Sequence, residues 1–348
     1  MRGAPPLVVL ALASAAERAG CPRDRSPLGR AAKPHLDRLA REGRVLSVRL
    51  ARDEEDAASP APLLALLGID PERPEARACS RASLLAARAP APGPGEGYAS
   101  AEFVSLFRDL LADAEPAGLT PGETELLLEA LREPFRRAGA RLVAGEGGRL
   151  LALGPRALFD PRTPPPDALL HRLSREALDG HEVNAVRRDL GRNGADMVWV
   201  SGPGAPAALP EPDPRRGPAS AAGEDALFQG ACRAAGLAWR DTAPGDAASA
   251  LAAAEAALAT DRVLFLHWRR GLRDALQRDL AARAEGLGEL DRAWVGPLAE
   301  RVAAAGGRLL VLPDLARDTA TGRPLPDPVP ALLWGAGVQA IGGRRFDE

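Results

Sequence analysis

The stretch VLPDLARDTATGRPLPDPVPALLWGAG, residues 311–337, contains two apolar runs separated by a polar, proline-rich loop. The first run ends at Asp314, and the second covers residues 329–335. Apolar runs of this length between turn residues are typical of buried strands. Because ligands commonly bind where such strands end, Asp314 is a first candidate functional residue, although the apolar Leu315 follows it.

Similar runs recur along the chain and alternate with amphipathic helical patterns. The strand-like runs are residues 6–12, 43–50, 196–202, 261–268, 307–314 and 329–335. The helical patterns include residues 33–43, 223–236 and 289–306. Strands that alternate with helices predict an α/β fold, with a parallel or mixed sheet and helices on both faces.

The middle of the chain has a different pattern. Residues 102–111 fit a strand or a helix, residues 120–139 an amphipathic helix, and residues 140–154 a hairpin whose turn is the glycine-rich stretch 145–148. This order favours a small α+β domain inserted into the α/β core. We predict that the core comprises residues 1–95 and 190–348 and the insert residues 96–189.

Composition limits the classes of partner. The chain has 348 residues, a net charge of −2 and no run of about 18 apolar residues, so neither nucleic acid nor a membrane is an expected partner. Its three cysteines, Cys21, Cys79 and Cys232, form neither a disulfide framework nor a zinc motif, which fits the cytoplasm. The alternative is export, if the apolar run near the N-terminus is a signal peptide.

Four segments, in chain order, carry a resemblance to a known family. They are SPLGRAAKPHLDRLAREG (26–43), ASPAPLLALLGIDP (58–71), HEVNAVRRDLGRNGADMVWVSGPG (181–204) and DPVPALLWGAGV with the closing FDE (327–348). Together they resemble the archaeal-type, cofactor-independent phosphoglycerate mutases of the alkaline phosphatase superfamily. The resemblance implies an alkaline-phosphatase-like α/β core and the interconversion of 2- and 3-phosphoglycerate through a phosphoserine. It also implies two divalent ions (Mn, Zn or Mg), held by carboxylates and imidazoles.

Only some of the family's site residues have a chemically equivalent residue in this chain. The resemblance places the serine nucleophile at Ser59 and one metal ligand at Asp314. The other ligand positions of the family carry side chains that have no donor atom, namely Ala11, Pro60, Leu272, Leu276, Leu315 and Pro324. Apolar replacement is physically reasonable once ions are lost, because buried carboxylates without a counter-charge are costly.

A second group of polar residues lies in HEVN (181–184), which resembles the family's HPVN motif, and in the residues after it. His181, Asn184, Arg187 and Arg188 are the candidates for binding a substrate or another anion, since guanidinium groups form paired hydrogen bonds with carboxylates and phosphates.

Two functional hypotheses follow. The first is a phosphoglycerate mutase-like protein that has lost most metal ligands, is catalytically inactive, needs no cofactor and binds an anion or a protein partner. The alternative is an active 2,3-bisphosphoglycerate-independent phosphoglycerate mutase, or a related metal-dependent phosphotransferase similar to homoserine kinases, that acts through phosphoserine at Ser59. A small phosphorylated metabolite is the expected ligand class, and the sequence identifies no protein partner.

Overall fold

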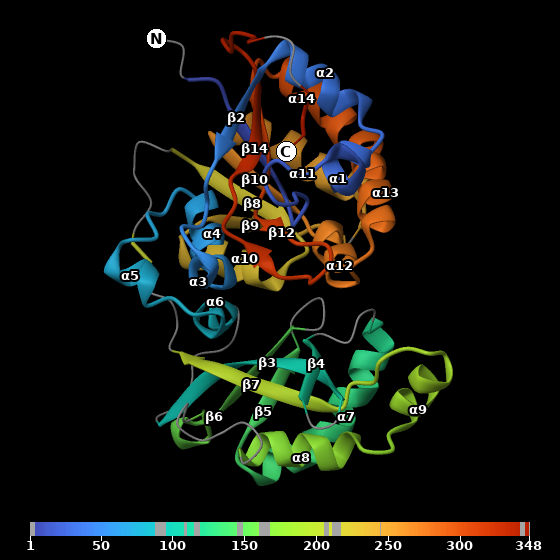
Figure 1. Ribbon diagram of the computed structural model, residues 1–348. Helices are drawn as coiled ribbons and strands as arrows, with labels where there is room; N and C mark the ends of the chain where they lie inside the picture. The colour runs from blue at the N-terminus through green and yellow to red at the C-terminus, as the bar shows by residue number, and fades with distance from the viewer. Residues whose placement is uncertain are drawn as a thin grey trace. The chain divides into compact units, whose positions relative to one another are not determined.

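The computed structural model describes residues 4–87, 95–107, 110–114, 119–144, 149–159, 168–204, 209–210, 217–243, 245–341 and 345–347. Contacts within the chain divide it into two compact units (Figure 1). The first unit consists of Met1–Arg77 and Leu209–Glu348, and the second of Ala78–Ala208. The predicted hairpin turn at 145–148 lies outside the described residues.

The first unit is built on a seven-stranded mixed sheet with the order β2-β14-β11-β1-β10-β8-β9. Its strands are β1 (Leu7–Leu12), β2 (Arg44–Val48), β8 (Ala219–Gly223), β9 (Ala238–Arg240), β10 (Val263–Trp268), β11 (Arg308–Pro313) and β14 (Val329–Gly335). Strands β11, β1, β10, β8 and β9 are parallel, and β14 at one side pairs in antiparallel orientation with both β11 and the edge strand β2. The predicted α/β fold with a parallel or mixed sheet is therefore confirmed.

Helices cover both faces of this sheet (Figure 1). The larger helices are α2 (Pro34–Glu42), α10 (Ala226–Ala234), α11 (Ala247–Thr260), α13 (Leu280–Leu290), the π-helical turn η6 (Asp291–Val295) and α14 (Gly296–Ala304). The shorter ones are η1 (Arg23–Arg25), α1 (Pro27–Arg30), α3 (Glu54–Ala58), α4 (Ala61–Leu66), α5 (Pro74–Arg77) and α12 (Arg270–Leu276). Leu10 and Leu12 of β1 are fully buried in one core with Trp294 and Val295 of η6.

The π-helical turn η6 has a structural role at the start of α2. The carboxylate of Asp291 is fully buried and accepts hydrogen bonds from the N–H groups of His35 (2.9 Å) and Leu36 (2.7 Å). Burial raises the pKa of Asp291, although the two N–H donors act in the opposite direction. A residue far along the chain thus caps α2, whose own N-cap residue, Lys33, makes no side-chain cap.

The second unit is a five-stranded antiparallel sheet with helices. Its strands are β3 (Glu96–Phe107), β4 (Leu110–Ala114), β5 (Arg141–Ala144), β6 (Arg149–Pro155) and β7 (Met197–Gly204). Its helices are α6 (Arg81–Ala86), α7 (Pro121–Arg137), the 3-10 turn η3 (Arg156–Phe159), α8 (Leu169–Leu178) and α9 (Glu182–Asp189). Residues Phe103, Leu127, Leu131 and Phe135 belong to its buried core.

This unit extends beyond the predicted insert of residues 96–189 at both ends. Strand β7 pairs with β3 in antiparallel orientation, so the run 196–202 belongs to this sheet and not to the core sheet. Helix α6 also packs on β3 and β7. The short strands β12 (Ala316–Arg317) and β13 (Pro324–Leu325) of the first unit form a separate pair. Among the described residues, no helix combines the length and the hydropathy needed to cross a bilayer.

Candidate functional site

A group of polar side chains lies at the carboxyl ends of the parallel strands of the first unit. The segment after β1 contains Ser14 and Glu17, Asp314 follows β11, and Arg269 follows β10. Asp225 follows β8 and caps α10 by accepting the N–H groups of Leu227 and Phe228, both at 2.9 Å. Because parallel strands end at the same edge of a sheet, these groups lie where α/β proteins usually bind their ligands.

Asp314, one of the predicted site residues, is held by neighbouring strands. Its Oδ1 accepts the N–H of Ser14 (2.7 Å), and its Oδ2 lies 3.2 Å from Nε2 of His267 at the end of β10. The His267 ring is 3% exposed and stacks on Phe228 at 4.7 Å. Both carboxylate oxygens of Asp314 are thus engaged by protein groups.

Arg283 organises the loop after β1, and the sequence interpretation missed it. Its guanidinium is 1% exposed and donates to the carbonyl oxygens of Ser14 (2.8 Å) and Ala16 (3.0 Å). It also contacts Thr319 and lies 3.4 Å from the carboxylate of Glu17, which accepts the N–H of Thr319 at 3.0 Å. A buried cation therefore fixes the segment from Ser14 to Glu17 against the segment after β12.

A signal for Arg283 was present in the sequence. Arg283, Leu287 and Leu290 are all buried and have i, i+4, i+7 spacing on α13. A charged residue on the apolar face of an amphipathic helix indicates a buried ion pair or a functional role. Its partner Glu17 could not be identified in the same way, because it lies 266 positions away in the chain.

Ser59, the predicted nucleophile, follows α3 and precedes α4. Its hydroxyl donates to the carbonyl of Asp56 (2.8 Å) and accepts the N–H of Ala61 (3.0 Å). Among the described residues, no carboxylate or imidazole is hydrogen-bonded to this hydroxyl. These contacts are those of a serine in a turn between two helices.

The apolar residues at the family's ligand positions lie on neighbouring elements of the same unit. Ala11 lies within β1 beside His267 and Leu312. Leu315 is packed with Ala51 and Ala57. Ala57 is two positions before Ser59 in the chain. The remaining positions are the buried Pro60, Leu272 in the buried part of α12, the half-buried Leu276 at its end, and Pro324 in β13. Within the described parts of the chain, no three His, Cys, Asp or Glu side chains gather so that they could bind a metal ion.

The predicted anion-binding residues lie in the second unit, where protein groups occupy much of their hydrogen-bonding capacity. His181 is the N-cap of α9, and its Nδ1 accepts the N–H of Val183 at 3.2 Å. Asn184 is fully buried, donates to the carbonyls of Leu178 (3.1 Å) and Ala195 (2.8 Å), and accepts the N–H of Ala195. These contacts stabilise the segment around α9.

The two arginines of this group are paired with carboxylates. Arg187 is 1% exposed, donates to the carbonyl of Asn193 (2.8 Å) and contacts Glu123 at 3.2 Å. Arg188 pairs with Asp196 at 2.7 Å, beside a cavity lined by two arginines and three carboxylates. That charge balance disfavours a free anion. Anion binding by these four residues remains a prediction, and their contacts weigh against it.

The Glu123–Arg187 pair leads to a prediction about pH. Burial raises the pKa of Glu123, but hydrogen bonds from Thr120 and Arg187 outweigh this effect and hold the pKa below its usual value. A lowered pKa means that the folded state favours the ionised carboxylate. Its stabilisation is therefore complete above the unfolded pKa of about 4.5 and is lost as the pH falls through the folded pKa.

We expect Glu123→Gln to lower the free energy of unfolding of the second unit by about 2 kcal/mol near pH 7. The difference from the wild type should shrink as the pH falls below about 4.5 and should vanish once the pH is below the lowered pKa of the folded state, where Glu123 is protonated in both states. Urea-dependent hydrogen exchange of peptides from α7, followed by mass spectrometry, measures the effect in this unit alone. Glu129→Gln, on the exposed face of α7, is the control and should show neither the loss nor its pH dependence.

The chain is similar to known proteins over most of its length. No protein-family model matches the chain. It is 26% identical to a 2,3-bisphosphoglycerate-independent phosphoglycerate mutase of Methanothrix thermoacetophila over 93% of this chain and 89% of that protein. It is also 26% identical to the 2,3-bisphosphoglycerate-independent phosphoglycerate mutase 2 of Methanothermobacter thermautotrophicus, over 93% of this chain and 87% of that protein.

Solved structures share the fold across nearly the whole chain. A protein of Pyrococcus horikoshii superposes with a TM-score of 0.74 at 20% identity, covering 99% of this chain and 91% of that one. A cofactor-independent phosphoglycerate mutase from Thermoplasma acidophilum gives a TM-score of 0.54 at 20% identity, with 99% and 93% coverage. The alkaline-phosphatase-like fold expected from the resemblance is therefore confirmed.

Proposed function

Because the chain belongs to the family of cofactor-independent phosphoglycerate mutases, we propose that it is a non-catalytic member of that family. In this proposal the chain keeps the fold but carries out no phosphoryl transfer, and it acts by binding a ligand or a partner. The observation that supports it most directly is the environment of Ser59, whose hydroxyl is bonded to the backbone of its own turn. A serine nucleophile requires an adjacent base or a metal ion to activate it.

The donor set at the carboxyl edge also does not fit the family's two divalent ions. Such ions need several hard anionic oxygens or imidazoles that converge on one point. Asp314 already accepts the Ser14 N–H and contacts His267, and Leu315 beside it packs against alanines. These residues therefore do not supply the donor atoms that a pair of divalent ions needs.

Metal content and mutase activity test the proposal together. We expect the protein purified in the presence of manganese to retain far less than one ion per chain, by inductively coupled plasma mass spectrometry. We also expect no conversion of 3-phosphoglycerate to 2-phosphoglycerate above background in an enolase-coupled assay. The Thermoplasma acidophilum mutase, assayed in parallel, serves as the positive control.

About two bound ions with turnover would overturn the proposal and support an active mutase. Turnover that Ser59→Ala abolishes would identify Ser59 as the nucleophile. Phosphorylation of homoserine, with loss of activity in the same variant, would instead support a related phosphotransferase.

We further propose that the protein acts in the cytoplasm. The structure joins none of Cys21, Cys79 and Cys232 in a disulfide, and Cys79 and Cys232 are buried. Unpaired cysteines are common in reducing compartments and less so in exported proteins. Fractionation of cells that express the full chain, followed by N-terminal mass analysis, would reveal export and cleavage of a leader.

A further inference from the structure

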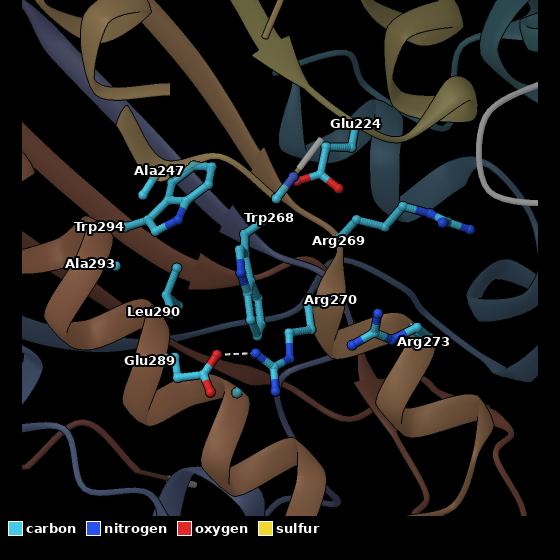
Figure 2. A pocket seen from close by; sticks show the side chains of 12 residues that line it. Glu224, Ala247, Trp268, Arg269, Arg270, Arg273, Glu289, Leu290, Ala293 and Trp294 are labelled. Carbon is cyan, nitrogen blue, oxygen red and sulfur yellow. Dashed lines mark hydrogen bonds and ion pairs between the residues drawn. The ribbon is translucent and has the colours of Figure 1, made fainter. Parts of the chain in front are cut away.

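The first unit contains a cavity of about 340 Å³ beside the end of β10 (Figure 2). Trp268 and Trp294 line it, and neither indole N–H has a hydrogen-bond partner among the described residues. The cavity carries no excess positive charge, because each guanidinium group in its lining is paired with a carboxylate and Glu224 adds a further carboxylate. The arginines near strand β2, at the edge of the same sheet, differ in this respect.

Strand β2 is the outermost strand of the core sheet (Figure 1), and within the described part of the chain its backbone pairs only with β14. In this pair Ser47 lies opposite Pro330, which has no N–H to donate. A hydrogen-bonded pair of an antiparallel ladder exchanges two N–H···O bonds, which Pro330 cannot do. The N–H and C=O groups of Ser47, and those of Val45 two positions before it, therefore point away from β14. The carbonyl of Gly43, the next residue of this series, accepts the N–H of Ile341 at 3.1 Å and not a group of β14.

The outward backbone groups of Val45 and Ser47 have no partner among the described residues, and the strand around them is accessible. Leu46 is 45% exposed and Ser47 is exposed, whereas Val45 packs against the core. An outer strand with free backbone groups can accept an additional strand, whose main chain supplies hydrogen bonds and whose alternate side chains supply specificity. Here Leu46 offers that strand an apolar contact.

Unpaired positive charge lies at the start of this edge. Arg41, in the last turn of α2, and Arg44, the first residue of β2, are both exposed. Neither makes a hydrogen bond or an ion pair within the described residues. The two carboxylates of α2, Asp37 and Glu42, are paired with other cations. Arg41 and Arg44 therefore leave an excess of positive charge near the outward backbone groups.

The charge at the other end of β2 is different. Arg49 donates to the carbonyl of Pro326 at 2.9 Å, and the acidic helix α3 follows a few residues later. The excess charge is therefore confined to the start of the strand. A second copy of the chain, paired antiparallel along β2, would bring its Arg49 towards Arg41 and Arg44, and like charges across neighbouring strands are destabilising. A segment with carboxylates at one end fits this edge better.

We propose that the outer edge of β2 binds an extended segment of a partner protein, in which alternating apolar residues are followed by carboxylates. The segment would run antiparallel to β2 and pair its backbone with that of Val45 and Ser47. Its acidic end would then meet Arg41 and Arg44. This inference gives a partner class to the proposed binding function. It does not rest on the loss of mutase activity, which the metal and turnover assays test separately.

Fluorescence anisotropy of a labelled synthetic peptide tests this inference on the full chain. The peptide alternates valine and threonine, ends in a pair of glutamates and has both termini blocked. We expect saturable binding of one peptide per chain. A peptide with lysines in place of the glutamates lacks the carboxylates, and one with N-methylated valines and threonines lacks the backbone donors. Each should bind at least about tenfold more weakly.

Two variants separate the role of charge from that of backbone pairing. Arg44→Gln should weaken binding of the acidic peptide about tenfold, because it removes a charged donor that has no partner among the described residues. Ser47→Pro removes an outward N–H and no bond of the ladder with β14, so it should also weaken binding about tenfold while the protein stays folded. Arg233→Gln is the control for charge and should bind like the wild type. Arg233 is exposed on α10, which packs on β8 and β9 at the opposite edge of the sheet.

A melting curve checks that each variant is folded, and if Ser47→Pro is not, Arg44→Gln and the N-methylated peptide still decide. The proposal is overturned if the acidic peptide shows no saturable binding up to about 1 mM, because the arginines would then only protect an exposed edge. Equal affinity of the acidic peptide and either control peptide overturns it as well, and so does wild-type affinity in Arg44→Gln. A dimer in sedimentation equilibrium that folded Ser47→Pro makes monomeric would show that β2 pairs with a second copy, which also contradicts the proposal.

Discussion

Replacing Arg283 with methionine is expected to lower the free energy of unfolding by about 3–5 kcal/mol, because the change leaves a buried carboxylate without its cation. Arg283 and Glu17 have side chains that are 1% and 7% exposed, so water cannot easily replace the lost contact. The carbonyl oxygens of Ser14 and Ala16 also lose a charged donor. Methionine fills a similar volume, and the cost therefore comes from polar groups and not from a cavity.

Urea unfolding followed by far-ultraviolet circular dichroism measures this loss, and an unchanged m-value would show that the unfolding transition is otherwise the same. Arg292→Met, on the exposed side of the adjoining turn, is the matched control and should change stability by less than about 0.5 kcal/mol.

The double variant Glu17→Gln with Arg283→Met should recover part of the loss, because it contains no unpaired buried charge. If Arg283→Met costs less than about 1 kcal/mol, Arg283 is not the cation that compensates Glu17. Other contacts would then have to hold the segment after β1 in its conformation.

The core strands of the first unit could be predicted because of where they lie in the sheet. Strands buried on both faces must be apolar throughout, and β1, β10 and β11 read as continuous apolar runs. Strand β8 has the same kind of position but the sequence ASAAG, whose small residues carry little hydropathy signal. It is buried because β10 and β9 lie on either side of it.

The partner of a strand is harder to predict than the strand itself. The run 196–202 is indeed a strand, but it pairs with β3, and no local pattern shows which distant segment will lie beside it. The sequence therefore indicated which segments are strands better than it indicated the sheet to which each strand belongs.

The candidate site shows the same limitation. Asp314 was found from its place at the end of a predicted strand, and Ser59 through a family resemblance. Glu17 and Arg283, which hold the loop after β1, were missed. Trp268 and Trp294 line one cavity from β10 and η6, and each reads in the sequence as an ordinary core aromatic. Their shared lack of an acceptor becomes visible only when the fold brings them together.

A second large effect is expected from Gly271→Ala, at the start of α12. A β-carbon at this position would lie 2.3 Å from the carbonyl oxygen of Ala13 and 2.9 Å from the ring of Trp268. The first neighbour is backbone at the end of β1 and cannot move aside like a flexible side chain. Gly271 does not have a positive φ, so the cost is steric and not conformational.

We expect Gly271→Ala to destabilise the first unit by about 3 kcal/mol, in spite of the higher helix propensity of alanine. Gly122→Ala is the matched control, because Gly122 also lies in the first turn of a helix and a β-carbon there would meet no atom within 4 Å. That substitution should be neutral or stabilise by up to about 1 kcal/mol. Thermal unfolding of both variants, with hydrogen exchange to locate the change, gives the comparison.

The close approach of α12 to Ala13 also positions Arg270 and Arg273 at the cavity that Trp268 and Trp294 line. If Gly271→Ala pushes α12 away from the sheet, hydrogen exchange of peptides from α12 should become faster as the stability falls, although neither guanidinium has been altered. If Gly271→Ala is as stable as the wild type, α12 does not rest on the end of β1. The positions of the two arginines at the cavity, which depend on that contact, would then have to be revised.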